Sequence, residues 1–133
     1  MKTVIISIKP EYVEKIFGGE KKWEFRKCRI TADKFLIYET APISKIVGEF
    51  NPRWVGEGTP EAIYAETCND GAGIDYDKFF EYFNGHKTAF AYEITNLKKY
   101  NEPLPIGYYG LNRPPLSFCY LKEGFEKWEN MKR

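Results

Sequence analysis

The most informative segment of this chain is Gly18–Lys27, which reads GGEKKWEFRK. The two glycines predict a helix end. The residues after them alternate in polarity, so an extended strand would place Trp23 and Phe25 on one face and Lys22, Glu24 and Arg26 on the other. We therefore expect a strand that packs through its aromatic face, carries charge on its opposite face and concentrates cations at one edge of the molecule.

The residues before this segment predict a strand followed by a helix. Thr3–Ile8 is short and rich in β-branched residues, which favours a buried strand. From Pro10 to Phe17 the apolar residues recur at helical spacing, and proline suits the first turn of a helix because its missing N–H costs little there. We expect a short amphipathic helix that ends at Gly18.

The remainder of the chain predicts further strands with helices inserted between them. Expected strands are 35–39, 43–50 ending at Asn51-Pro52, 87–97 as the longest, and 116–121. Expected helices run from a Thr59 cap to about Thr67 and from an Asp75 cap to about Asn84. The pattern favours an α+β fold, a small mixed and partly closed β-barrel of about five to six strands with two to three flanking helices. We expect one domain over residues 1–133, with a peripheral tail after about residue 124 in which Phe125 and Trp128 sit in a helical turn.

Composition excludes several classes of protein. Twenty Lys and Arg residues nearly balance nineteen Asp and Glu, so any site for a polyanion must be local. Three cysteines without CxxC spacing and a single histidine, His86 at an expected turn, suggest no disulfide, no metal site and no cofactor. The short apolar run at the N-terminus is too brief for a secretion signal, and no stretch approaches a membrane span. We expect a reduced, cytoplasmic protein.

The chain resembles the ASCH domain family. The likeness lies in Ser7–Tyr12, in Gly19–Arg26 with its G-x-K-x-x-E-x-R pattern, in Ile37–Pro42, in Lys45–Phe50 and in Pro114–Phe118. This resemblance implies a PUA-like barrel with flanking helices and a cleft lined by Lys21, Glu24 and Arg26. It also implies action on RNA or on modified nucleosides.

The residue chemistry is compatible with binding of a nucleotide. Arginine presents a planar fork to phosphate or a base edge, lysine a compact cation, and glutamate an acceptor for amino groups. Exposed aromatic residues such as Trp54 and Tyr108-Tyr109 can stack on bases, or they can cover the ends of the barrel. The expected residues for RNA or ligand binding are Lys9, Lys21, Lys22, Glu24, Arg26, Arg53 and Trp54. The alternative for Glu24 is a modest ion pair with Lys22 or Arg26.

Two enzymatic hypotheses use the same residues. Some proteins similar to this family hydrolyse acylated cytidine with a Lys, a Thr three residues later and a distant Glu. Lys21 matches that Lys and Glu93 can match that Glu, with Lys21 as its candidate cationic partner, but Glu24 stands where the Thr would be. In a ribonuclease, Lys21 and Arg26 would stabilise a phosphorane and Glu24 would act as general base.

A third hypothesis is a regulatory domain that binds a small ligand. The sequence leaves open whether the chain is an enzyme and what its oligomeric state is.

Overall fold

The computed structural model describes residues 1–122. The expected helical turn at Phe125 and Trp128 lies outside the described residues. No helix within this part of the chain is long and apolar enough to cross a membrane. The thiols of Cys28, Cys68 and Cys119 are free.

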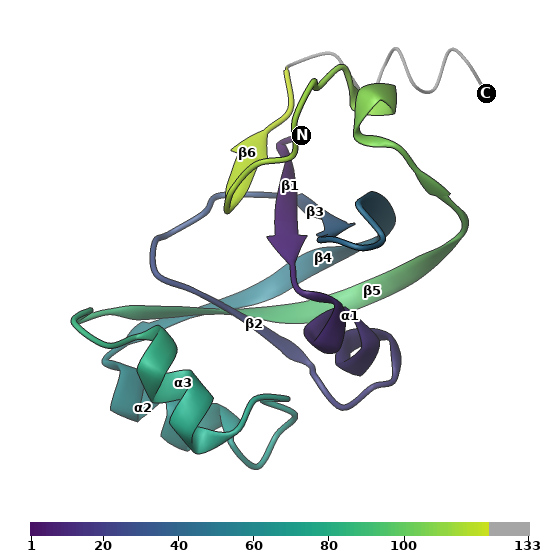
Figure 1. The fold of residues 1–133 in the computed structure, drawn as a ribbon. Helices are drawn as coiled ribbons and strands as arrows, with labels where there is room; N and C mark the ends of the chain where they lie inside the picture. The colour runs from purple at the N-terminus through teal and green to yellow at the C-terminus, as the bar shows by residue number, and fades with distance from the viewer. Residues whose placement is uncertain (123–133) are drawn as a thin grey trace.

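The described chain forms one mixed sheet that curls into an incomplete barrel (Figure 1). The six strands are β1 (Thr3–Ile8), β2 (Trp23–Arg26), β3 (Lys34–Glu39), β4 (Lys45–Gly58), β5 (Ala89–Leu104) and β6 (Phe118–Tyr120). Their order is β2-β5-β4-β3-β1-β6; β1 and β3 run parallel, and every other neighbouring pair is antiparallel. The prediction of an α+β fold with a small, partly closed barrel is confirmed.

Two long bent strands, β4 and β5, connect the halves of the sheet. The first half of β4 pairs with β3 on one side and with β5 on the other, and its continuation to Gly58 pairs with β5, which also carries β2. The prediction that this strand ends at Asn51-Pro52 is wrong, because β4 continues to Gly58. Its pairing with β5 shifts register around Pro52, and such a bulge accommodates a residue that has no N–H to donate to the ladder.

Within the described residues, three α-helices flank the sheet: α1 (Pro10–Phe17), α2 (Pro60–Thr67) and α3 (Tyr76–Tyr82). Two of them begin at the predicted caps. The Thr59 hydroxyl accepts a hydrogen bond from the Ala62 N–H at 3.1 Å, and the Asp75 carboxylate accepts one from the Lys78 N–H at 2.9 Å. In Figure 1, α2 and α3 lie together at one side of the sheet, while α1 lies close to the end of β1.

The apolar core divides over the two faces of the sheet. On β5, Tyr92 packs with Val4, Ile6 and Phe35 against α1, whereas Ala89 and Ala91 on the opposite face pack against α2 and α3. The alternation predicted for this strand is therefore present.

A short 3₁₀ helix, Ile106–Tyr109, follows β5. The sequence left open whether Tyr108-Tyr109 would be exposed for stacking or would cover an end of the barrel, and Tyr109 is buried against Ile5, Leu36 and Ile46. The aromatic pair Tyr108-Tyr109 thus covers part of the core.

Candidate functional site

The site is built on β2, whose alternation separates two buried faces. Trp23 and Phe25 pack into the cluster beneath α2 and α3, where Phe25 meets Phe79 edge-on at a centroid distance of 5.1 Å. Glu24 and Arg26 point the other way, and Lys21 precedes the strand. Of the three residues of the predicted charged face, Lys22 is exposed and precedes the strand. The other two, Glu24 and Arg26, are buried, at only 6 and 7% exposed, as is Lys21 at 4%. Charges this enclosed require partners within the fold.

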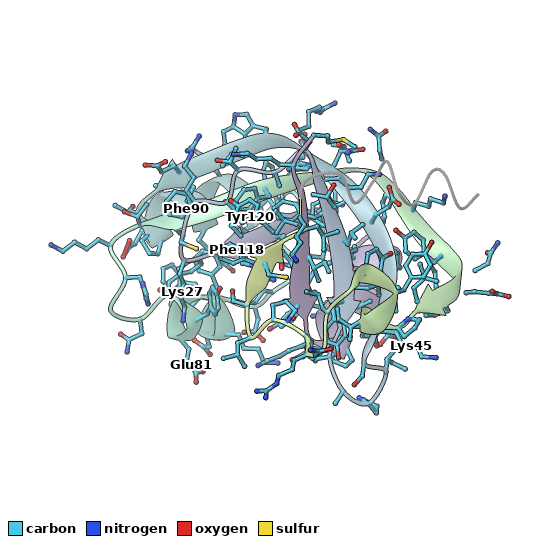
Figure 2. The ribbon with its side chains drawn as sticks, turned by 90° about the horizontal axis from the view of Figure 1, so that it is seen from above. Lys27, Lys45, Glu81, Phe90, Phe118 and Tyr120 are labelled. Atoms are coloured by element: carbon cyan, nitrogen blue, oxygen red, sulfur yellow. The ribbon has the colours of Figure 1, made fainter. Side chains whose placement is uncertain are left out.

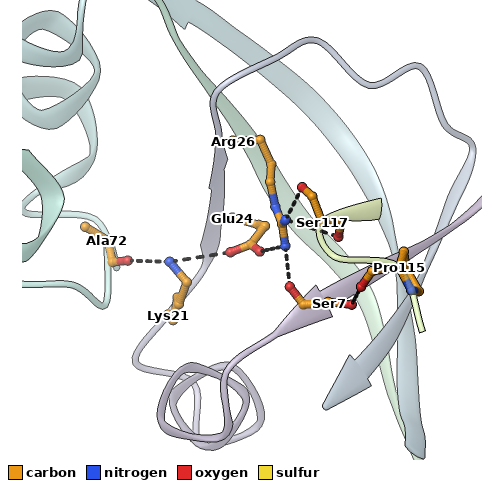
Figure 3. Close-up of polar contacts among 7 residues, drawn as sticks. All are labelled: Ser7, Lys21, Glu24, Arg26, Ala72, Pro115 and Ser117. Atoms are coloured by element: carbon orange, nitrogen blue, oxygen red, sulfur yellow. Dashed lines mark hydrogen bonds and ion pairs between the residues drawn. The ribbon is translucent and has the colours of Figure 1, made fainter. Parts of the chain in front are cut away.

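Arg26 holds three segments of the chain together (Figure 3). Its Nη2 donates to Glu24 Oε2 at 2.8 Å and to the Ser7 carbonyl at 2.9 Å. Its Nη1 donates to Ser117 Oγ at 3.2 Å. Because Ser7 Oγ in turn donates to the Pro115 carbonyl at 2.7 Å, the segment before β6 is fixed against the end of β1. The guanidinium therefore connects the chain segments around the site and also contributes a positive charge to it.

Lys21 lies in a cage of aromatic rings and oxygens. Its Nζ donates to the Ala72 carbonyl at 3.2 Å, lies 3.8 Å from Glu24 Oε1, and sits 4.6 and 5.5 Å from the ring centroids of Phe25 and Tyr12. Burial lowers the pKa of the Lys21 ammonium to about 8; the charge of Arg26 acts in the same direction and that of Glu24 opposes it. A substantial fraction of this amine is therefore neutral at slightly alkaline pH.

A loop from the helical layer closes over Lys21 and Trp23. The Gly71 carbonyl accepts from the Lys22 N–H at 2.7 Å, and the Asp70 carbonyl accepts from the Trp23 indole at 3.0 Å. Gly73 has φ +68°, and a Cβ built on it would lie 2.4 Å from Lys21 Cβ. Glycine is required here both for its backbone conformation and for this close approach.

Lys21, Glu24 and Arg26 form the floor of a cleft of about 860 Å³. Five cationic side chains and three carboxylates line it, so its charge is positive although the whole chain is close to neutral. Lys27 lies over the Tyr82 ring at 4.4 Å, and Lys78 pairs with Glu11 at 3.4 Å. Burial raises the pKa of both Tyr12 and Tyr82, so both phenols are neutral at physiological pH. The charged and aromatic lining residues outside β2 are Lys9, Glu11, Tyr12, Lys21, Lys27, Lys78, Phe79, Glu81 and Tyr82.

The remaining predicted site residues are divided between the cleft and other surfaces. Lys9 is exposed and lines the cleft. Lys22 does not line it, because its side chain packs beside Gly71.

Arg53 and Trp54 lie just beyond the strand end predicted at Asn51-Pro52, but they belong to β4 after its bulge. They lie outside the lining of the cleft: Arg53 Nε pairs with Glu93 Oε1 at 2.8 Å, and Trp54 packs edge-on against Trp23 at 5.4 Å. Glu93 therefore has Arg53 as its partner rather than Lys21, which pairs with Glu24.

Sequence reasoning did not assign a role to several residues of the cleft. Ser7 and Ser117 lie within two of the segments that carry the ASCH likeness, and that likeness was the available signal for them. Tyr12 lies at the end of one of these segments as well, whereas Lys78 and Tyr82 had no such signal, because helix–sheet packing brings them to β2 from a distant part of the chain. Within residues 1–122, no group of three or more His, Cys, Asp or Glu side chains is arranged to hold a metal ion.

Comparison with known sequences finds segments of longer proteins. The chain is 30% identical over 122 residues to ATP synthase subunit alpha of Ureaplasma parvum serovar 3, covering 90% of this chain and 15% of that protein. It is 28% identical over 123 residues to large ribosomal subunit protein uL22 of the same organism, covering 90% of this chain and 39% of that protein. The chain thus spans a minor part of each of these relatives. No family model matches the sequence.

Comparison with solved structures finds likeness over nearly the whole chain. The crystal structure of the ASCH protein from Zymomonas mobilis superposes with a TM-score of 0.84 at 20% identity, covering 98% of this chain and 94% of that one. Serine-to-alanine and tyrosine-to-phenylalanine variants of that protein give TM-scores of 0.85 and 0.82, at 20 and 21% identity, covering 98% of this chain and 96 and 98% of theirs. Identities this low establish the fold. Together with the sheet order and the cleft on β2, they show that this chain has the fold of an ASCH domain.

Proposed function

We propose that this chain binds RNA or a modified nucleotide in the cleft above β2. The observation that carries the proposal is the buried group of Lys21, Glu24 and Arg26 on the floor of a positively lined cleft of about 860 Å³. A nucleotide combines an anionic phosphate with a flat polar base. The lysines of the cleft can bind the phosphate, and its tyrosine rings and hydrogen-bonding groups can bind the base.

The lysines at the rim provide the clearest test because they are exposed and can be changed without disturbing the buried group. Lys9 and Lys27 both line the cleft and are exposed. In Figure 2, Lys27 and Glu81 lie on one side of the molecule and Lys45 lies on the other side. Lys45 is exposed and does not line the cleft, so it supplies a control that removes the same charge outside the lining.

The experiment measures binding of a fluorescent single-stranded RNA at several salt concentrations. We expect the double variant Lys9→Ala, Lys27→Ala to bind at least about tenfold more weakly. The plot of log affinity against log salt should become less steep by roughly 1.4, because each lost contact with a phosphate of a single strand contributes about 0.7 to the slope. The double variant Lys2→Ala, Lys45→Ala should resemble the wild type. Equal binding by both double variants, or no binding of RNA or nucleotides by the wild type, would refute the proposal.

A hydrolase acting on modified nucleosides or RNA is the second candidate, favoured by one observation. Lys21 has its pKa lowered to about 8 beside the Glu24 carboxylate, so its neutral amine can accept a proton during catalysis. Turnover of an N4-acylcytidine or of labelled RNA that rises with pH through about 8, and disappears in Lys21→Met, would support this function. Absence of turnover on both substrates across pH 6 to 9 would exclude it.

A further inference from the structure

The carboxylate of Glu24 has one oxygen engaged and one oxygen without a hydrogen bond. Oε2 accepts from Arg26 at 2.8 Å. Oε1 lies 3.8 Å from Lys21 Nζ, which is an ion-pair distance, and no donor among residues 1–122 makes a hydrogen bond to it. The side chain is nine-tenths buried and lines the cleft. Among the described residues, the fully enclosed polar side-chain atom without a partner is Arg26 Nε, so Oε1 is open to the cleft and available to accept a hydrogen bond from an N–H group of a ligand.

Lys21 places a donor next to this acceptor. Its ammonium has three N–H groups, one of which is directed to the Ala72 carbonyl. The rings of Phe25 and Tyr12 and the enclosing loop hold Nζ in place. A ligand that satisfies both groups must present an N–H donor and an acceptor on neighbouring atoms of one edge.

We propose that Glu24 Oε1 and Lys21 Nζ together recognise the amide edge of a nucleobase, a ring N–H next to a carbonyl, as guanine and uracil present. This inference rests on the proposed function and specifies the class of base. The Glu24 oxygen accepts the ring N–H, and the Lys21 ammonium donates to the neighbouring carbonyl. Tyr12, Tyr82 and the exposed Leu116 supply apolar surface for the faces of the ring.

A carbonyl suits Lys21 better than a ring nitrogen does. A carbonyl oxygen has two lone pairs and accepts over a broad range of directions, whereas a ring nitrogen has one lone pair in the plane of the base. Because its contacts with Ala72, Phe25 and Tyr12 fix the position of Nζ, a base must bring its own lone pair to that point, and a carbonyl does so over more orientations of the base. Adenine has no carbonyl, and the exocyclic amino group of cytosine lies next to an unprotonated ring nitrogen. Either base would leave one of the two buried charges poorly paired.

The test compares nucleotides on the wild-type protein by competition against a fluorescent RNA. The competitors are the 5′-monophosphates of uridine, guanosine, cytidine, adenosine and N3-methyluridine, of which the last has lost the donor N–H. We expect uridine and guanosine monophosphates to compete at least about tenfold better than the other three. Equal competition by all five, or preference for cytidine or adenosine, overturns the inference and leaves nucleotide binding intact. No binding of any nucleotide overturns the proposed function together with it.

The variant Glu24→Gln tests the assigned atom. We expect it to bind uridine and N3-methyluridine monophosphates within about twofold of each other, while Lys45→Ala keeps the wild-type preference. A folded Glu24→Gln protein, judged by its circular dichroism melting curve, that retains the tenfold preference refutes the role of Oε1. If this variant does not fold, the comparison of methylated and unmethylated ligands on the wild type decides the question.

Discussion

Replacement of Lys21 by methionine should remove a specific pH dependence of stability. Lys21 is 4% exposed, and burial lowers its pKa from the ordinary 10.5 to about 8 in the folded protein. Between these two values the unfolded chain binds more protons than the folded protein, so the wild type becomes more stable as the pH rises. A shift of this size corresponds to roughly 3 kcal/mol in total, at 1.36 kcal/mol for each pH unit.

The quantity to measure is the difference in free energy of unfolding between the wild type and Lys21→Met, from urea titrations between pH 7 and 10. Taking this difference cancels the contributions to stability of the other groups that titrate in this pH range. From pH 8.5 to 10 the wild type should gain about 1.5 to 2 kcal/mol relative to the variant. The prediction concerns the change of this difference with pH and not its value at neutral pH. That value combines two opposing effects, because methionine removes a buried charge but leaves the Ala72 carbonyl and Glu24 Oε1 without a cation.

The neighbouring Lys22 provides a matched control. It is exposed and lies outside the lining of the cleft, so Lys22→Met removes a lysine from the same segment without removing a buried ammonium. Two outcomes would show that burial does not desolvate the Lys21 ammonium. One is a change of less than about 0.5 kcal/mol in the stability difference between the wild type and Lys21→Met over this pH range. The other is an equal rise in the stability difference between the wild type and Lys22→Met.

Three further predictions concern the packing around the cleft. Gly73→Ala should lower stability by more than Gly85→Ala and should also weaken nucleotide binding. Both glycines have positive φ, which costs an alanine about 1 kcal/mol, but only at Gly73 would the new Cβ meet Lys21; equal melting temperatures would contradict this. Phe79→Ala should cost about 3 to 5 kcal/mol in urea unfolding, since this fully buried ring supports Phe25; a loss below about 1 kcal/mol would be inconsistent with that packing. Leu116→Ala should leave the melting temperature unchanged and weaken nucleotide binding, because the side chain is fully exposed at the cleft; unaltered affinity would remove it from the proposed site.

Local patterns in the sequence predicted several elements with their boundaries. β1, α1 and α2 begin and end where composition, proline and caps placed them. These signals are local, since a cap such as Thr59 acts on residues three positions away. The boundary at Pro52 was wrong, because a β-bulge depends on the register of the partner strand and leaves no reliable mark in the sequence.

The candidate site divides in the same way. The sequence by itself determined that β2 alternates, that Lys21, Glu24 and Arg26 occur at the spacing of the ASCH pattern, and that one face of this strand is charged. Tertiary structure alone decided that these charges are buried, that Lys21 bonds to a carbonyl 51 residues away, and that Arg26 bonds to a serine 91 residues away. It also excluded Arg53 and Trp54 from the lining of the cleft and brought in Tyr12, Lys78 and Tyr82. The physical reason is that alternation fixes only the face on which a side chain lies. Whether that face meets solvent, and which partners it meets, depends on how distant helices and loops pack over the sheet.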